Sequence, residues 1–197
     1  MRIRLFRSAL VAVLALLVAP CAQPARTGAM VASVDPDTRI AAGNPLRNAV
    51  VIRSVTGGEE TSPLWTSEVS DADFRRALEL SLKQNALLGG ADAPLRLTTT
   101  LLRLDQPLVG FSMTVGSSVR YDVRAADGST VFDETITASG TASFSDTPIG
   151  VERLRIANEK SIRANIGSFM QRLIEKSRRD PSSFGGNATS GLRLFLG

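Results

Sequence analysis

The chain has 197 residues, with 23 Lys and Arg residues against 19 Asp and Glu residues, a single Cys and no His. Without His it cannot form a Ser-His-Asp or Cys-His nucleophile system, and no imidazole can ligate a metal or shuttle a proton. One Cys provides neither an intramolecular disulfide nor a Cys-rich zinc site. Beyond the first few residues the positive charges are interleaved with acidic ones, so we expect no nucleic-acid binding, which needs clustered cations.

Residues 1–20 are predicted to be a signal peptide. Arg2, Arg4 and Arg7 form a basic start, and an uninterrupted apolar stretch follows over residues 9–19. This stretch is too short to span a bilayer, which needs about 20 residues, and it has the length of a secretory apolar region. The pattern therefore predicts an exported protein.

The segment Val18-Ala19-Pro20-Cys21 resembles a bacterial lipobox, in which an aliphatic residue and two small residues precede a Cys that becomes lipidated. Pro20 departs from the Gly, Ala or Ser that usually stands before the Cys. The resemblance implies that Cys21 becomes the first residue of the mature chain and carries acyl chains such as palmitate, which anchor it to a membrane. The alternative is ordinary signal-peptidase cleavage nearby, which would leave a soluble periplasmic protein.

Residues 21–47 are expected to comprise the lipid-anchor Cys and a flexible tether after it. This stretch is rich in Ala, Pro, Thr, Asp and Gly, it has no helical or strand period, and Pro24, Pro36 and Pro45 interrupt it. Such a composition is typical of a linker that holds a domain away from a surface.

From residue 48 the pattern changes to that of a folded domain. A β-branched run over residues 49–52 predicts a buried strand, and Ser70 is a suitable N-cap for a helix that ends at Gly89. Strands are predicted over residues 94–104, 111–125 and 130–144, with Phe111 and Phe144 on the inward face, an Asp127-Gly128 hairpin and a bulge or bend at Gly140. A second helix is predicted to start after Thr147, with Pro148 in its first turn, and to run to Lys176.

These elements predict an α+β fold over residues 48–177, a two-layer sandwich in the order β-α-β-β-β-α. The four-stranded sheet is expected to be mainly antiparallel, with its first strand paired in parallel and two helices on one face. Residues 178–197 are expected to form a flexible C-terminal tail.

Several motifs of this domain carry a family resemblance. They are the Phe-x-x-Ala-Leu helix starting at Phe74, Leu87-Leu88-Gly89 at its end, the strand Val119–Val123, the Asp127-Gly128 turn, and the short motifs Arg153-Leu154, Ala157-Asn158-Glu159 and Asn165-Ile166. With the lipobox-like Cys21, the chain resembles the small Gram-negative envelope lipoproteins typified by YajG. Its architecture is also similar to that of the LPS-assembly lipoprotein LptE, which plugs a β-barrel partner. The resemblance implies a location on the periplasmic side of the outer or inner membrane, and it transfers no functional residues.

No catalytic residue, metal ligand or cofactor is predicted. Lys83, Lys160 and Lys176 lie on predicted helices among charged neighbours, which is typical of solvated faces. Asp133 and Glu134 are adjacent on a strand, so their side chains point to opposite faces and cannot form a carboxylate pair. We therefore expect a protein that is not an enzyme.

The outward face of the predicted sheet is the candidate interaction surface. The residues proposed for it are Ser112, Thr114, Ser118, Arg120, Arg124, Thr135 and Thr137, with Trp65 as a further contact. A solvated sheet face is the ordinary interpretation of such a pattern, and a cap over the core is the ordinary interpretation of a lone Trp.

Two functions are kept as hypotheses. The first is a membrane-tethered, non-enzymatic lipoprotein that acts as an accessory or assembly factor, with an envelope protein as its partner. The second is a soluble periplasmic module that binds a small molecule or a glycan in a concave, polar pocket.

Overall fold

The computed structural model describes residues 23–59, 68–107 and 110–184. The signal peptide, Cys21 and Trp65 lie outside these ranges. The main elements are the strands β1 (Val50–Thr56), β2 (Leu95–Asp105), β3 (Met113–Arg124) and β4 (Thr130–Ala142), and the helices α3 (Asp71–Gln84) and α4 (Gly150–Arg179). Shorter helical segments are α2 (Thr27–Met30), η2 (Pro36–Thr38) and η3 (Pro181–Ser183).

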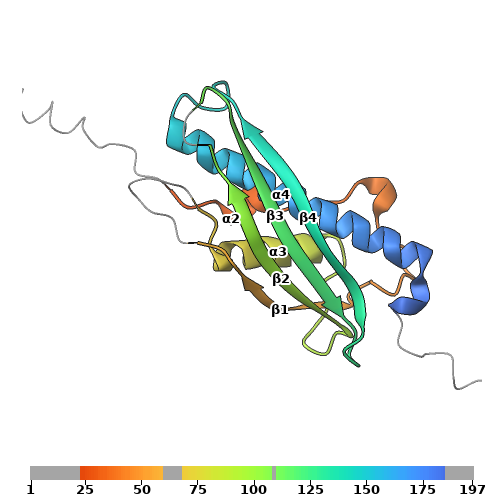
Figure 1. The fold of residues 1–197 in the computed structure, drawn as a ribbon. Coiled ribbons are helices and arrows are strands. Elements are labelled where there is room, and N and C mark those ends of the chain that lie inside the picture. Colours follow the sequence, from red (N-terminus) through yellow and green to blue (C-terminus); the bar gives the residue numbers. More distant parts are fainter. Residues whose placement is uncertain (1–22, 60–67, 108–109, 185–197) are drawn as a thin grey trace, which may run out of the picture.

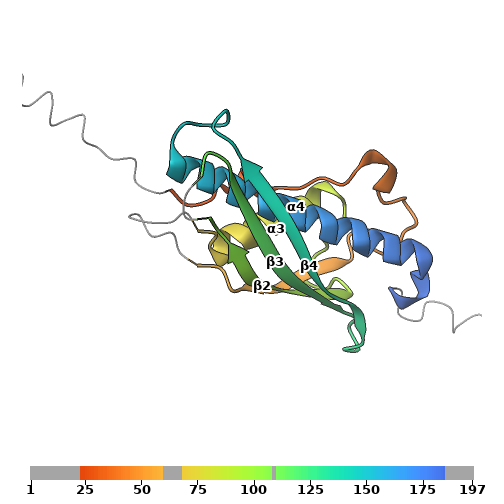
Figure 2. The same ribbon diagram turned by 45° about the horizontal axis from the view of Figure 1, so that its top comes forward.

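The fold is a two-layer α+β sandwich, as predicted. The strand order is β1-β2-β3-β4, with β1 parallel to β2 and the other pairs antiparallel. The helices α3 and α4 lie against the same face of the sheet (Figures 1 and 2). Among the described residues, no helix combines the length and the apolar character needed to cross a membrane.

Strand β3 shows why the sheet has one dry face. Its residues alternate strictly between buried and more exposed positions, because successive side chains of a strand point to opposite sides. The ring of Tyr121 stacks on Phe169 of α4 with a centroid distance of 4.1 Å, and Phe132 of β4 meets the same ring edge-on at 5.7 Å. This aromatic cluster lies at the centre of the core between the sheet and α4.

The prediction that Phe111 and Phe144 face the inside of the fold is wrong. The β3–β4 pairing ends at Met113 and Ala142, and beyond it the chain turns away from the sheet. Phe111 is 85% exposed and Phe144 is 57% exposed. The alternation of apolar and polar residues continues in the sequence beyond the strand. It no longer predicts which side chains are buried there, because the period of two holds only for extended, paired backbone.

Gly140 causes no bulge, because the β3–β4 register runs through it without a shift. Its role is to let α4 pass close to the sheet. A Cβ at this position would lie 2.6 Å from the carbonyl oxygen of Ala157, and it would also overlap the backbone nitrogen of Ser161. The Gly within the strand therefore marks a close approach between a helix and a strand, and not the bulge or bend that the sequence predicted.

Helix α4 begins two residues later and ends three residues later than predicted. Ile149 is its N-cap residue, and the helix continues to Arg179. The Thr147 hydroxyl still acts near this end, since its Oγ1 accepts a hydrogen bond from the Ile149 N–H at 3.3 Å. The same hydroxyl donates to Glu152 at 2.8 Å.

The flexible tether is a wrong prediction for residues 23–47, because these residues pack on the domain. Met30 and Leu46 are fully buried in the main core. The Ala32 N–H donates to Ser81 Oγ of α3 at 2.9 Å, and the Val34 N–H donates to Asn85 Oδ1 at 3.0 Å. Single apolar residues at irregular spacing fill the gap between α3 and α4, so the segment has no period for sequence analysis to find.

The start of the predicted C-terminal tail is also part of the fold. Residues 178 and 179 belong to α4. Asp180 is the N-cap of η3, and its Oδ1 accepts a hydrogen bond from the N–H of Ser183, the last residue of η3. Phe184 is buried in the core. Residues 185–197 lie outside the described part of the chain.

The close approach at Gly140 yields a stability prediction. Gly140→Ala should lower the free energy of unfolding by about 1–3 kcal/mol, because the added methyl group forces α4 away from β4. Gly90→Ala is the matched control, since nothing lies within 4 Å of a Cβ there. Urea unfolding of both variants checks this, and an unchanged midpoint for Gly140→Ala would contradict the proposed packing constraint.

Candidate functional site

The open face of the sheet carries hydroxyl and charged side chains. Ser118 of β3 lies opposite Thr137 of β4, and Arg120 lies opposite Thr135. The Thr114 and Thr141 hydroxyls are 2.9 Å apart. The structure thus brings six of the proposed surface residues onto one face of adjacent strands, namely Thr114, Ser118, Arg120, Arg124, Thr135 and Thr137. We call these six residues the polar face.

Two other proposed contacts are not placed on this face. Ser112 is exposed, but it precedes β3 and lies outside the β3–β4 pairing. Trp65 lies outside the described residues, so its role stays a prediction.

Strand β2 extends the polar face with two Thr residues that were not among the predicted surface residues. Thr100 lies opposite Arg120, and Thr98 lies opposite Asp122. The Thr56 hydroxyl of β1 donates to Thr100 Oγ1 at 3.4 Å. The signal was present in the sequence, because Thr98 and Thr100 alternate with the inward Leu97, Thr99 and Leu101.

The two Arg side chains of the polar face are compensated by Asp side chains beside it. The Arg120 guanidinium donates two hydrogen bonds to Asp133, at 2.8 and 2.7 Å. These bonds lower the pKa of Asp133 and raise the pKa of Arg120. Arg124 likewise donates to Asp122 at 3.0 Å. The face therefore offers hydroxyl donors and acceptors on a background of paired charges rather than a field of one sign.

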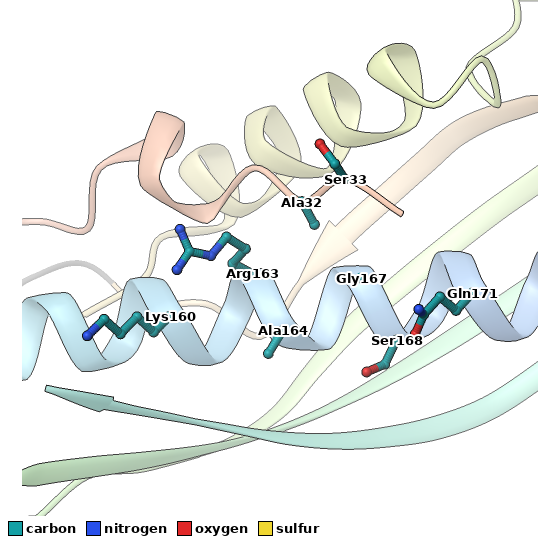
Figure 3. A pocket seen from close by; sticks show the side chains of 8 residues that line it. All are labelled: Ala32, Ser33, Lys160, Arg163, Ala164, Gly167, Ser168 and Gln171. Carbon is teal, nitrogen blue, oxygen red and sulfur yellow. The ribbon is translucent and has the colours of Figure 1, made fainter. Parts of the chain in front are cut away.

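A groove lies on the opposite side of the molecule, between α4 and the segment that follows α2. Its volume is about 350 Å³. Figure 3 shows the cationic side chains of Lys160 and Arg163 toward one end and the polar side chains of Ser168 and Gln171 toward the other. Lys160 is already engaged, because its Nζ donates to the Thr141 carbonyl and to Asp146, each at 2.9 Å.

An ionic cluster whose centre, Glu159 and Arg155, is buried connects the N-terminal segment to α4. Glu159 is 2% exposed, and it accepts hydrogen bonds from Arg155 Nη1 at 2.8 Å and from the Arg26 backbone N–H at 2.8 Å. The Arg26 guanidinium adds two bonds at 3.1 Å, and they raise the pKa of Arg26. Arg155 also contacts Glu152 at 3.1 Å. We call these four residues the Glu159 cluster.

The buried Tyr121 belongs to a hydrogen-bond network that stabilises the fold. Its hydroxyl donates to Asn165 Oδ1 at 3.0 Å, and burial raises its pKa well above the ordinary value. Asn165 Nδ2 in turn donates to the Ile136 carbonyl at 2.8 Å. This network joins α4 to β3 and β4 and leaves the phenol protonated, so it is not poised to act as a base.

No three His, Cys, Asp or Glu side chains in the described part of the chain gather closely enough to hold a metal ion. The carboxylates whose pKa departs from the ordinary value, among them Asp127, Asp133, Asp146 and Asp180, are all shifted downward by hydrogen bonds. A general acid at neutral pH needs the opposite shift. The arrangement thus suits non-covalent contacts at the polar face and in the groove.

No protein-family model and no curated protein matches the chain. Among solved structures, the fold is similar to that of protein XCC0632 from Xanthomonas campestris, of family-model DUF330. The TM-score is 0.56 at 9% sequence identity, over 76% of this chain and 94% of that one. At this identity the similarity shows a shared fold alone.

Two further structures show weaker similarity. A protein from Caulobacter crescentus, described as a candidate lipoprotein, gives a TM-score of 0.49 at 14% identity over 68% of this chain and 95% of that one. The Minor Lipoprotein from Acinetobacter baumannii gives a TM-score of 0.41 at 14% identity, over 68% of this chain and 96% of that one.

The Glu159 cluster leads us to predict that a single substitution at Glu159 strongly lowers the stability of the fold. Glu159→Gln should lower the free energy of unfolding by about 3 kcal/mol, because it removes the anion that compensates the buried Arg155. It should also speed proteolysis at the N-terminal segment. Glu175→Gln is the control, since Glu175 is an exposed carboxylate on the same helix. Urea unfolding and limited proteolysis measure the two effects, and equal behaviour of the two variants would contradict the proposed role.

Asp146 predicts a pH dependence of stability. The hydrogen bond from the Ser143 N–H, together with that from Lys160, lowers its pKa from the ordinary 3.8 to about 2. Because the folded pKa is depressed, the charged form stabilises the fold. Its contribution is complete above the unfolded pKa and is lost as the pH falls through the folded pKa.

Asp146→Asn should therefore lower the urea midpoint at pH 6, and its difference from the unchanged protein should shrink as the pH falls from about 4 to about 2. The exposed Asp92 serves as the control, and Asp92→Asn should change little. A difference between the unchanged protein and Asp146→Asn that is constant with pH would show that the Asp146 charge is not responsible.

Proposed function

We propose that the protein is a non-enzymatic envelope lipoprotein, of the YajG-like kind, that acts as an accessory or assembly factor. Acyl chains on Cys21 would hold it on the periplasmic side of the outer or inner membrane. The polar face would dock an envelope protein. The observation that carries the proposal is this broad, charge-compensated hydroxyl surface on a domain that begins directly after a lipobox-like Cys.

The shape of the polar face favours a protein as its ligand. Small molecules bind in concave sites that surround most of their surface, whereas this face is the side of an open sheet. Paired charges such as Arg120 with Asp133 attract neither strongly acidic nor strongly basic surfaces. Hydroxyl groups can donate and accept, so a partner with mixed hydrogen-bonding groups fits best.

The chemistry of the chain supports a role without catalysis. It has no His, and its one Cys is the proposed lipid attachment site. The buried Glu159 is bonded to two Arg side chains, and Tyr121 is held by Asn165. These buried titratable groups therefore serve the fold.

Site-directed photo-crosslinking in a Gram-negative host tests the docking proposal. A photoreactive amino acid replaces Thr137 or Thr135 on the polar face, and Glu175 on α4 in a control chain. We expect one specific adduct with an envelope protein from both polar-face positions and none from position 175. No adduct, or the same adducts from all three positions, would contradict docking through this face.

The groove beside α4 favours a second candidate, a module that binds a small anionic molecule or glycan. Its volume of about 350 Å³ and the exposed guanidinium of Arg163 at its edge are the specific observations. Thermal-shift measurements with a panel of anionic oligosaccharides test it. A stabilisation that disappears in Arg163→Ala would support this candidate, and an unchanged melting temperature throughout would argue against it.

A further inference from the structure

Four large apolar side chains are exposed in the described part of the chain, and three of them lie in the connections at one end of the molecule, whereas Leu102, at 54%, lies within β2. The most exposed is Phe111 at 85%, in the β2–β3 connection, and the β4–α4 connection contributes Phe144 at 57% and Ile149 at 41%. Figures 1 and 2 show both connections at the same end, opposite the β3–β4 hairpin. We call these three residues the apolar tip.

One buried cation holds the two connections together. Arg153 of α4 donates from Nη2 to the Gly110 carbonyl at 3.1 Å and from Nη1 to the Thr147 carbonyl at 2.9 Å. Its guanidinium carbon also lies 5.6 Å from the centre of the Phe144 ring. The backbone next to Phe111 and the ring of Phe144 are thus fixed to the same side chain, so the apolar tip is a built surface.

The described chain begins toward this end, at residue 23. Ala25 is buried, and Arg26 is bound to Glu159. Glu159 is ten residues after Ile149 on α4, which corresponds to about 15 Å along the helix. Cys21 precedes Ala25 by four residues, which can span at most about 14 Å. In both views the described chain begins beside the start of α4, at the end where the apolar tip lies (Figures 1 and 2).

We propose that the apolar tip inserts into the surface of the bilayer to which Cys21 is anchored, as a second membrane contact. The inference rests on the proposed lipid anchor at Cys21. The short reach from Cys21 to Ala25 favours lipid as the occupant, because it keeps this end of the domain close to the membrane. Aromatic and aliphatic side chains are stabilised at the boundary between headgroups and acyl chains.

This contact would also orient the domain. With the apolar tip in the membrane, the β3–β4 hairpin points away from it, and the polar face is turned sideways. Partners embedded in the membrane and soluble partners could then both reach the polar face. A lipid on Cys21 alone would leave the domain free to rotate about its attachment point.

Tryptophan fluorescence tests the contact on the lipidated full chain, purified from the membranes of a Gram-negative host. The sole Trp is first removed as Trp65→Phe. The reporter is then Phe111→Trp, and the matched control is Ala126→Trp in the exposed β3–β4 hairpin. Each chain is reconstituted into vesicles of phosphatidylethanolamine and phosphatidylglycerol, with or without phosphatidylcholine brominated on its acyl chains.

We expect the reporter at position 111 to shift to shorter wavelength and to lose about half its emission to the brominated lipid, as a ring buried about 5–10 Å deep should. The reporter at position 126 should keep its emission. A chain that floats with the vesicles while position 111 stays unquenched would overturn the inference and leave the anchor standing. A blue shift without quenching would also overturn it, and would indicate a protein or a second copy as the occupant.

Vesicle flotation separates the two proposals. If the purified chain carries no acyl group and does not float, the anchor itself has failed. A chain produced without residues 1–20, which keeps the single Cys at position 21, is then coupled through it to vesicles that carry a maleimide lipid, and the quenching is measured again. Quenching at position 111 in this tethered form would support the apolar tip independently of natural lipidation, and its absence would refute it.

Discussion

The placement of the N-terminal segment depends on the hydrogen bonds between the Glu159 carboxylate and Arg26. This carboxylate is buried on α4 and bonded to Arg155 from the same helix and to both the backbone and the side chain of Arg26. A buried anion is stable only when cations and hydrogen bonds compensate it, so Arg26 is held in one place. The segment that follows therefore packs between α3 and α4 and belongs to the core. The proposed attachment site, Cys21, is therefore separated by only four residues of chain from the buried Ala25.

The two faces of the domain have different tasks because the sheet is covered on one side only. The helix side buries the aromatic cluster of Tyr121, Phe132 and Phe169, and Gly140 allows α4 to approach β4 closely. The other side carries the polar face, whose two Arg side chains are paired with the neighbouring Asp133 and Asp122. A surface of this kind selects by shape and hydrogen-bond pattern more than by net charge. The apolar tip lies at the end of the layers and is a separate surface with a different chemistry.

The regular parts of the fold were predictable from the sequence, and the irregular parts were not. The alternation in β3 and the Asp127-Gly128 turn specify the hairpin, and Ser70 specifies the start of α3, because each is a local signal with a local cause. The packing of Met30 and Leu46 has no such signal, because single apolar residues at irregular spacing are buried by distant helices. Phe111 and Phe144 continued a strand pattern past the point where the pairing ends. Most of the polar face followed from the strand period, whereas the groove depends on two segments that only the tertiary structure brings together.

Mass spectrometry of the mature N-terminus, on protein from the membrane fraction of a Gram-negative host, tests the proposed lipid anchor. We predict that the mature chain begins at Cys21 and carries acyl chains on the sulfur and the amino group of that residue. An unmodified N-terminus beyond Cys21, on protein recovered from the soluble periplasm, would contradict it. The groove beside α4 would then become the principal candidate site of a soluble binding module.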